Sequence, residues 1–155
     1  MKKVKIYLGG GWFNDKQKEI IDFIETSIFN YPSLQVFSPR RETSIKEGTV
    51  PTSGEKKRVF TDNLNAISNS DLMIASTEGK DMGTLFECGY AYANNIPIIY
   101  VYFTDNPLGF NLMLSQSSIG VITNKSNFKE LLNLIEINGV KDGLFTRFEY
   151  TGKIE

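Results

Sequence analysis

Glu87 is the residue of this chain whose type and surroundings most strongly indicate chemistry. It lies within residues 81–91, which apart from Asp81 at the start carry mostly apolar or small side chains and are predicted to form a buried helix. A buried carboxylate is costly unless it is paired with another group or used in a reaction. Gly83 and Ala91, four residues to either side, leave room for a ligand to approach. The chain has no histidine, so acid–base chemistry would fall to carboxylates. The structural alternative for Glu87 is a buried ion pair.

Tyr7 and Asp81 are the next candidates for a reactive site. Tyr7 stands at the carboxyl end of a predicted strand, and a buried phenol usually finds a hydrogen-bond partner. Glu87 could be that partner, and a core tyrosine is the alternative. Asp81 stands near the start of the helix that carries Glu87, where capping and the helix dipole favour a carboxylate. It could therefore serve as a cap or in the site.

A glycine run, Gly9–Gly11, follows the first predicted strand and precedes a helix. It does not fit the dinucleotide-binding pattern G-x-G-x-x-G, because Asn14 stands where the third glycine is needed. The adjacent Trp12 and Phe13 suit stacking against a flat ring better than cradling a phosphate. A tight turn with a packed tryptophan is the alternative.

Composition limits the partners that the chain is expected to have. The 155 residues, 41% of them hydrophobic, suit a single domain spanning 1–155. Lys and Arg number 17 against 18 Asp and Glu, so the net charge of -1 gives no reason to expect nucleic acid or a membrane surface as partner. We interpret Arg40, Arg41 and the basic residues within 46–58 as a solvated loop and helix face.

Cys88 is the single cysteine, so no internal disulfide is expected, and we interpret it as a packing residue. With no histidine and no clustered acidic pattern, neither a metal nor a cofactor is expected. No apolar run approaches the roughly 18 residues that a membrane span needs. The sequence therefore predicts a cytoplasmic location.

Strand-like and helix-like segments alternate along the chain. Strands are predicted at 4–8, 34–37, 71–75, 96–103 and 119–122, and helices at 12–30, 55–68, 81–94 and 128–137, with a loop at 43–53. In the helix at 55–68, Val59, Phe60, Leu64 and Ile67 share an apolar face. Alternation with apolar central strands predicts an α/β fold: a single-domain, five-stranded, mostly parallel sheet flanked by helices, flavodoxin- or Rossmann-like. Ligands of such sheets bind at the carboxyl ends of the strands.

Taken together, these segments resemble the nucleoside 2-deoxyribosyltransferases. Residues 6–13, Ile-Tyr-Leu-Gly-Gly-Gly-Trp-Phe, are similar to that family's first strand and loop. The pattern Asp-x-Gly-Thr-x-x-Glu-x-Gly-Tyr-Ala at 81–91 is similar to its catalytic helix, and Asn-Leu-Met at 111–113 to a segment that a neighbouring subunit lends to the site. The similarity covers nearly the whole chain.

The resemblance implies an enzyme that exchanges nucleobases on 2-deoxyribose by a ping-pong, retaining mechanism. Glu87 would be the nucleophile and form a covalent deoxyribosyl-enzyme, Tyr7 would orient it, and Asp81 would bind the sugar or assist proton transfer. Deoxynucleosides and free nucleobases would be the substrates. The implied substrate-binding residues are Gly9, Trp12, Phe13, Asp62, Asn63, Gly83, Asn111 and Met113. Asn111 and Met113 would close a neighbour's site, which implies a homo-oligomer, hexameric by resemblance.

Two departures from the family pattern bear on base recognition. Asn63 stands where lactobacillus-type members carry an Asp near the base, and Asp62 precedes it, so either residue could serve. The glutamine that reads the base in those members is missing from the loop after Pro39. Base preference is therefore left open.

Two other functions remain as alternatives. One is a hydrolase of the same fold, an N-glycosidase acting on deoxynucleoside 5′-monophosphates. Arg40 and Arg41 could bind its phosphate, although the loop at 9–15 has no basic residue. The other is a non-catalytic sensor of a nucleotide derivative, which would not need Tyr7, Asp81 and Glu87 together.

Overall fold

The computed structural model describes residues 2–104 and 106–155, and within them five strands form one sheet. The order is β2-β1-β3-β4-β5, and each neighbouring pair is parallel. The strands are β1 (Val4–Gly9), β2 (Leu34–Phe37), β3 (Leu72–Ser76), β4 (Ile98–Val101) and β5 (Gly120–Ile122). The predicted five-stranded α/β sheet is confirmed, and it is entirely rather than mostly parallel.

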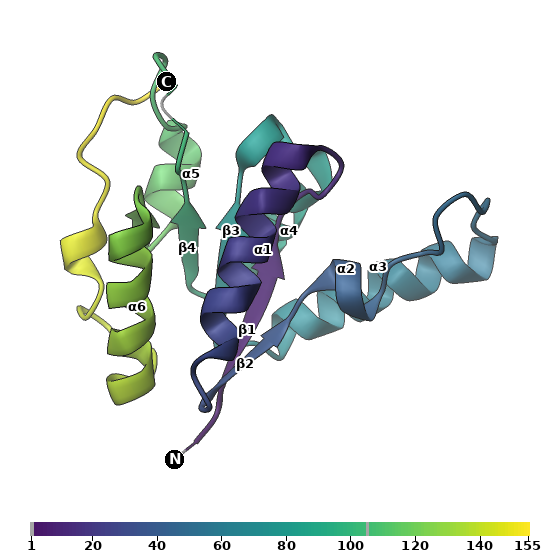
Figure 1. The fold of residues 1–155 in the computed structure, drawn as a ribbon, viewed down its shortest axis with the longest axis horizontal. Helices are drawn as coiled ribbons and strands as arrows, with labels where there is room; N and C mark the ends of the chain where they lie inside the picture. Colours follow the sequence, from purple (N-terminus) through teal and green to yellow (C-terminus); the bar gives the residue numbers. More distant parts are fainter. Residues whose placement is uncertain (1, 105) are drawn as a thin grey trace.

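Helices cover both faces of this sheet (Figure 1). They are α1 (Asp15–Phe29), α2 (Pro39–Glu42), α3 (Ser53–Ser68), α4 (Met82–Ala93), α5 (Leu112–Ser117) and α6 (Lys125–Asn138), with 3-10 turns η1 (Glu78–Lys80) and η2 (Thr146–Phe148). Alternate strand residues point to opposite faces, so Ile6 and Leu8 pack with α1 and α6, whereas Tyr7 packs with Cys88 and Ala91 of α4. Strand β3 is buried on both faces, as its apolar run predicts.

The segment expected to be a buried helix is buried on one side alone. In α4, Thr84, Cys88 and Ala91 are buried against the sheet. Met82 and Phe86 expose 84% and 55% of their surfaces. An apolar composition therefore did not distinguish a helix packed on all sides from one that presents apolar side chains outward.

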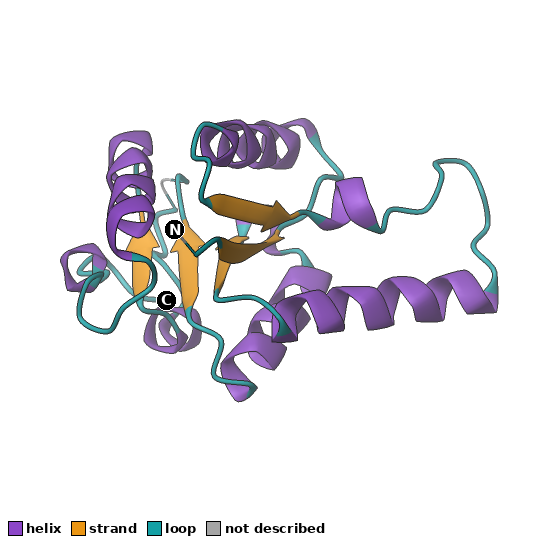
Figure 2. Ribbon diagram, turned by 90° about the horizontal axis from the view of Figure 1, so that it is seen from below, coloured by secondary structure: helices purple, strands orange, loops and turns teal. Residues whose placement is uncertain are grey.

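Helix α3 extends away from the sheet past β2, as Figures 1 and 2 both show. Of the apolar residues predicted to share one face of this helix, Ile67 alone is buried, and all of the helix is described. Phe60 is 54% exposed. The first half of this helix thus forms a wall beside the sheet.

Element boundaries differ from the prediction where capping or chain length decides them. Helix α1 begins at Asp15 rather than at 12, because the side chain of Asn14 accepts a hydrogen bond from the Gln17 amide and caps the helix. Strand β4 is shorter than the predicted 96–103. Helices α2 and α5, with four and six residues, are too short to show a helical period.

The strand order creates a crevice at the carboxyl ends of β1 and β3. The chain leaves β1 through α1 to reach β2 on one side, and it returns to pair β3 on the other side of β1. Loops that leave β1 and β3 in opposite directions open a ligand crevice between them. Among the described residues, no helix is both long and apolar enough to cross a membrane.

Candidate active site

Tyr7 and Glu87 meet beneath the crevice, although 80 residues separate them in the sequence. Tyr7 is fully buried in β1, and its hydroxyl donates a hydrogen bond to Oε2 of Glu87 on α4. The Tyr7 ring stacks on Phe37 of β2 with 5.7 Å between the ring centroids. Because packing holds the ring and the ring's hydroxyl holds the carboxylate, Glu87 has a fixed orientation.

The electrostatic environment makes Glu87 unusual among carboxylates. Burial raises its pKa to about 7, and the negative charge of Asp81 adds to that effect, while the hydrogen bond from Tyr7 opposes it. Burial and the neighbouring charge of Glu87 raise the pKa of Tyr7 well above its usual range. The phenol therefore stays protonated and acts as a donor.

A pocket of about 430 Å³ opens above Glu87. Its size is within the range for small-molecule sites. Aromatic rings form much of its wall, in two pairs: Trp12 and Phe13 stack at 5.2 Å, and Phe60 and Phe86 meet at 5.9 Å between ring centroids. The polar side chains that line it are Lys56, Asn63, Asp81, Thr84 and Glu87. A flat, mostly apolar ligand with a few polar atoms fits this lining.

Asp81 borders the pocket and also begins α4. Its Oδ2 accepts hydrogen bonds from the amide and the hydroxyl of Thr84, at 2.9 and 2.7 Å. Among the described residues, Oδ1 accepts none, so the capped carboxylate keeps one oxygen for a ligand. The capping role expected for Asp81 is thus present, together with a position at the pocket wall.

Asn63 and Asp62 have different surroundings on α3. Asn63 lines the pocket, and its Oδ1 accepts a hydrogen bond from the Thr43 hydroxyl at 2.8 Å. Asp62 is absent from the described pocket lining and pairs with Arg58 at 3.5 Å, one helical turn earlier. Of these two sequence candidates, Asn63 is the one at the pocket.

Gly9, Asn111 and Met113 are absent from the described lining of this pocket. Gly9 is buried one residue below it, where an added Cβ would lie 2.7 Å from the Met73 side chain; Gly10 borders the pocket instead. Asn111 caps α5 and borders a separate, larger cavity of about 810 Å³ that does not include Glu87. Met113 is 75% exposed.

Gln17 is a site-supporting residue that the sequence did not indicate. It is 4% exposed, and its Oε1 accepts a hydrogen bond from the Phe13 amide while its Nε2 donates to the Glu78 carbonyl, both at 2.9 Å. It therefore ties the loop after β1 to the turn after β3. Gly79, at φ +74°, has no room for a Cβ because this amide fills the space. The signal that could have revealed Gln17 is its helical spacing from Ile20, Ile21 and Ile24, which places this polar side chain on the buried face of α1.

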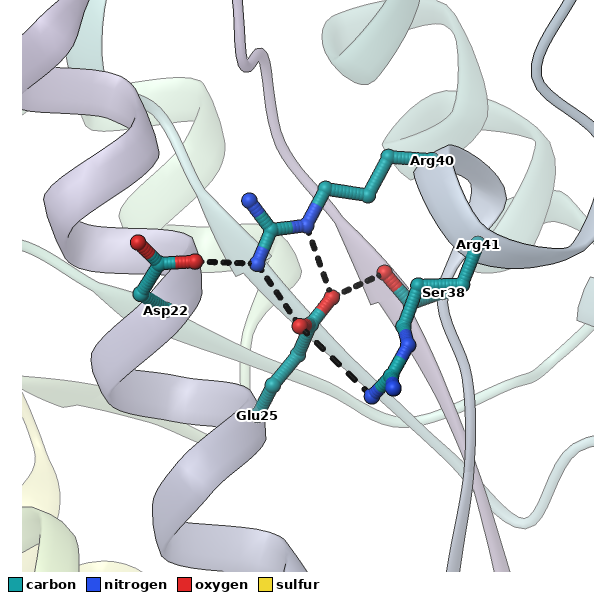
Figure 3. A network of polar contacts seen from close by, with 5 residues as sticks. All are labelled: Asp22, Glu25, Ser38, Arg40 and Arg41. Carbon is teal, nitrogen blue, oxygen red and sulfur yellow. Dashed lines mark hydrogen bonds and ion pairs between the residues drawn. The ribbon is translucent and has the colours of Figure 1, made fainter.

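Arg40 does not belong to a solvated face, which corrects the sequence interpretation. Its guanidinium binds Asp22 and Glu25 of α1, and Ser38 donates a hydrogen bond to Glu25 at 2.6 Å (Figure 3). Although burial acts in the opposite direction, hydrogen bonds from Arg40 and Ser38 hold the pKa of Glu25 below its usual range. Arg41 also lies 3.9 Å from Glu25. Both arginines are thus engaged away from the pocket.

The chain belongs to the nucleoside 2-deoxyribosyltransferase family, whose model matches residues 6–135. Family membership supports an enzyme with small nucleosides and bases as substrates. No curated protein sequence matches the chain. Its fold is shared by a 2-deoxyribosyltransferase from Bacillus psychrosaccharolyticus, with 24% identity and a TM-score of 0.71 over 81% of this chain and 90% of that one.

Two further solved structures share the fold at a lower TM-score of 0.55. A conserved protein from Enterococcus faecalis V583 is 22% identical over 99% of this chain and 82% of that one. A CMP N-glycosidase from Clostridium botulinum is 17% identical over 84% of this chain and 99% of that one. The same fold thus occurs in a protein described as a transferase and in one described as a glycosidase.

Proposed function

We propose that the protein transfers 2-deoxyribose between nucleobases through a covalent deoxyribosyl-Glu87 intermediate. The observation that carries this proposal is a half-buried carboxylate, oriented by Tyr7, in the lining of a pocket that aromatic rings also line. A carboxylate placed in this way stabilises positive charge on a sugar carbon and can attack it. The aromatic walls suit the flat base on the other side of the glycosidic bond.

In the first half-reaction, an oxygen of ionised Glu87 attacks C1′ of the deoxynucleoside. The C1′–N bond breaks, its electron pair goes to the base, and the base takes up a proton and departs. Tyr7 keeps the attacking oxygen in place. Asp81, with one carboxylate oxygen directed by Thr84, binds the sugar or carries the proton.

In the second half-reaction, a nitrogen of the acceptor base attacks C1′, its N–H proton returns to the group that protonated the first base, and the Glu87 carboxylate leaves. Two displacements at the same carbon restore its configuration, so the exchange proceeds with retention. Transfer exceeds hydrolysis only if water is excluded from the intermediate. Trp12 and Phe13, which stack on each other in the pocket lining, supply an apolar cover for that purpose.

A second copy of the chain completes the site in this proposal. Asn111 and Met113, which the family resemblance assigns to a neighbour's site, lie outside the described lining of their own chain's pocket. Met113 is exposed and so available to another subunit. The expected assembly is a homo-oligomer. Loss of exchange on dissociation would support the shared site, whereas full activity of a monomer would contradict it.

One chromatographic experiment tests the transfer. The protein is incubated with thymidine and adenine together, with thymidine alone, and with deoxyinosine and adenine in case only purines exchange. Deoxyadenosine that forms only when donor and acceptor are both present supports transfer. Glu87→Ala should abolish it, and Glu19→Gln, an exposed carboxylate on α1, is the matched control. Exchange by Glu87→Ala would refute the proposal.

The second candidate is an N-glycosidase that hydrolyses deoxynucleoside 5′-monophosphates. Arg40 and Arg41 no longer favour it, because both lie against Glu25. Lys56, a basic side chain at the pocket wall, is the observation in its favour. Free thymine from thymidine monophosphate, with no exchange product and with loss of the reaction in Lys56→Met, would establish this function in place of transfer.

A further inference from the structure

The buried hydroxyl of Thr43 contacts Asn63, a residue of the pocket lining. Thr43 is 4% exposed, and its Oγ1 lies 2.8 Å from Oδ1 of Asn63 and 3.2 Å from the Pro39 carbonyl oxygen. A hydroxyl has one proton to donate. The shorter contact is the one to Asn63, so Asn63 Oδ1 accepts this proton with one of its two lone pairs.

Thr43 ends the turn α2, which begins after Ser38 and contains Arg40, two residues of the polar network in Figure 3. Its amide donates to the Pro39 carbonyl at 2.9 Å and closes the single turn of α2. Ser38 at the start of that turn donates to Glu25, and Arg40 within it binds the same carboxylate. Since Glu25 is on α1, the turn that carries Thr43 is anchored to the body of the protein.

We propose that Thr43 fixes the Asn63 amide with its nitrogen toward the pocket, so that Asn63 presents a permanent hydrogen-bond donor to the nucleobase. An asparagine amide has one oxygen acceptor and one NH2 donor group. Thr43 occupies the oxygen, and Asn63 lines the pocket while Thr43 is not among the described lining residues. The inference rests on the proposed function, because it assumes that the pocket receives a base.

A donor of this kind defines the class of base that the pocket accepts. The base must present a ring nitrogen or carbonyl oxygen to Asn63, because a C–H or N–H there would leave the amide unpaired. When C1′–N breaks, the electron pair enters the base and Asn63 strengthens its hydrogen bond to the developing negative charge. An amide does not titrate in this range, so Asn63 assists the departing base without supplying its proton.

The test uses free bases, which do not react without a sugar donor, and the fluorescence of Trp12, the single tryptophan, which lines the pocket. The protein is titrated with adenine and with its 1-deaza, 3-deaza and 7-deaza analogues, each of which replaces one ring nitrogen by C–H. Loss of one hydrogen bond is expected to weaken binding about tenfold for one analogue. Asn63→Leu should remove this difference in affinity between adenine and the weakened analogue, and Thr43→Val should remove most of it.

Matched controls come from exposed neighbours on the same helix. Asn65→Leu and Thr61→Val make the same chemical changes on α3 at exposed positions and should keep the wild-type difference between analogues. Asn63→Asp introduces a titratable group of the same shape. In that variant the affinity difference between adenine and its analogues should depend on pH, whereas in the wild type it should stay constant. Thermal unfolding of each variant verifies that it is folded.

Three results would overturn the inference. Persistence of the difference in Asn63→Leu would show that another group binds the base. An unchanged difference in Thr43→Val, with loss in Asn63→Leu, would show that Thr43 does not orient the amide. Equal binding of all analogues to the wild type would mean that Asn63 presents no donor. By contrast, absence of exchange between deoxynucleosides and adenine in the chromatographic experiment would refute the proposed function itself.

Discussion

Replacing Glu87 by Gln should stabilise the protein at alkaline pH and leave its stability nearly unchanged at pH 4. The pKa of Glu87 is raised from 4.5 to about 7 in the folded protein, chiefly by burial. Below pH 4.5 the folded and unfolded states both carry a protonated carboxyl, so it contributes no penalty. Between pH 4.5 and 7 the unfolded chain ionises first, and folding stability declines. Above pH 7 the full penalty applies, which at 1.36 kcal/mol per pH unit is about 3 kcal/mol.

The assay is thermal unfolding of Glu87→Gln and wild type between pH 4 and 8.5. Glutamine has the shape of the carboxyl group but no charge, and its oxygen can still accept the Tyr7 hydrogen bond. For a chain of this size, 3 kcal/mol corresponds to roughly 6–12 °C in Tm. The difference between the two proteins should grow from near zero to that range and level off above pH 7. Glu19→Gln should show no such growth. A difference that stays the same at every pH would refute the assignment of a buried, raised-pKa carboxyl.

The remaining predictions concern the same pair and the network that supports it. The first-order rate of exchange should fall as pH drops below about 7, because attack needs ionised Glu87, and a profile flat down to pH 5 would contradict this. Tyr7→Phe removes a hydrogen bond that lowers the Glu87 pKa, so the acidic fall in rate should move to higher pH, measured from kcat against pH. Gln17→Ala should lower the unfolding free energy by about 2 kcal/mol, because two hydrogen bonds are lost. It should raise KM more than it lowers kcat, because the loop that carries Trp12 is no longer bonded to Gln17. A fall in kcat alone would contradict that role. Glu25→Gln leaves Arg40 without its buried partner and should cost about 3 kcal/mol in denaturant unfolding; no loss would show that the ion pair is not stabilising.

The parallel sheet was predictable because its signals are local and repeated. Runs such as Leu72–Ala75 are apolar on both faces, and a glycine or proline bounds several of the strands. Partner choice at the site was partly predictable too. Tyr7 of β1 and Glu87 of α4 are brought together because α4 follows β3, the strand that pairs with β1 at the crevice.

What the sequence did not predict depends on contacts between distant segments. A helical period predicts the apolar face of α3 but does not say which part of the protein covers that face. In the structure, Phe60 and Val59 of this face line the pocket. Arg40 reads as solvated because Asp22 and Glu25, its partners, belong to another helix. Asp62 and Asn63 are adjacent, so they point about 100° apart around α3, and only Asn63 lines the pocket. A sequence alignment that is uncertain by one residue cannot decide which of the two faces the pocket.

The position of Glu87 links the stability of the fold to the chemistry proposed for it. Holding this carboxylate ionised costs folding free energy, because burial raises its pKa above the ordinary value. When an oxygen of Glu87 forms an ester with C1′, its charge disappears and so does the reason for that penalty. Part of the energy withheld from stability is therefore available to the attack on the sugar. A more exposed carboxylate would be cheaper to fold but would lose both this advantage and the protection from water that transfer requires. For this reason we expect gains in stability at position 87 to be accompanied by losses of exchange rather than of substrate binding.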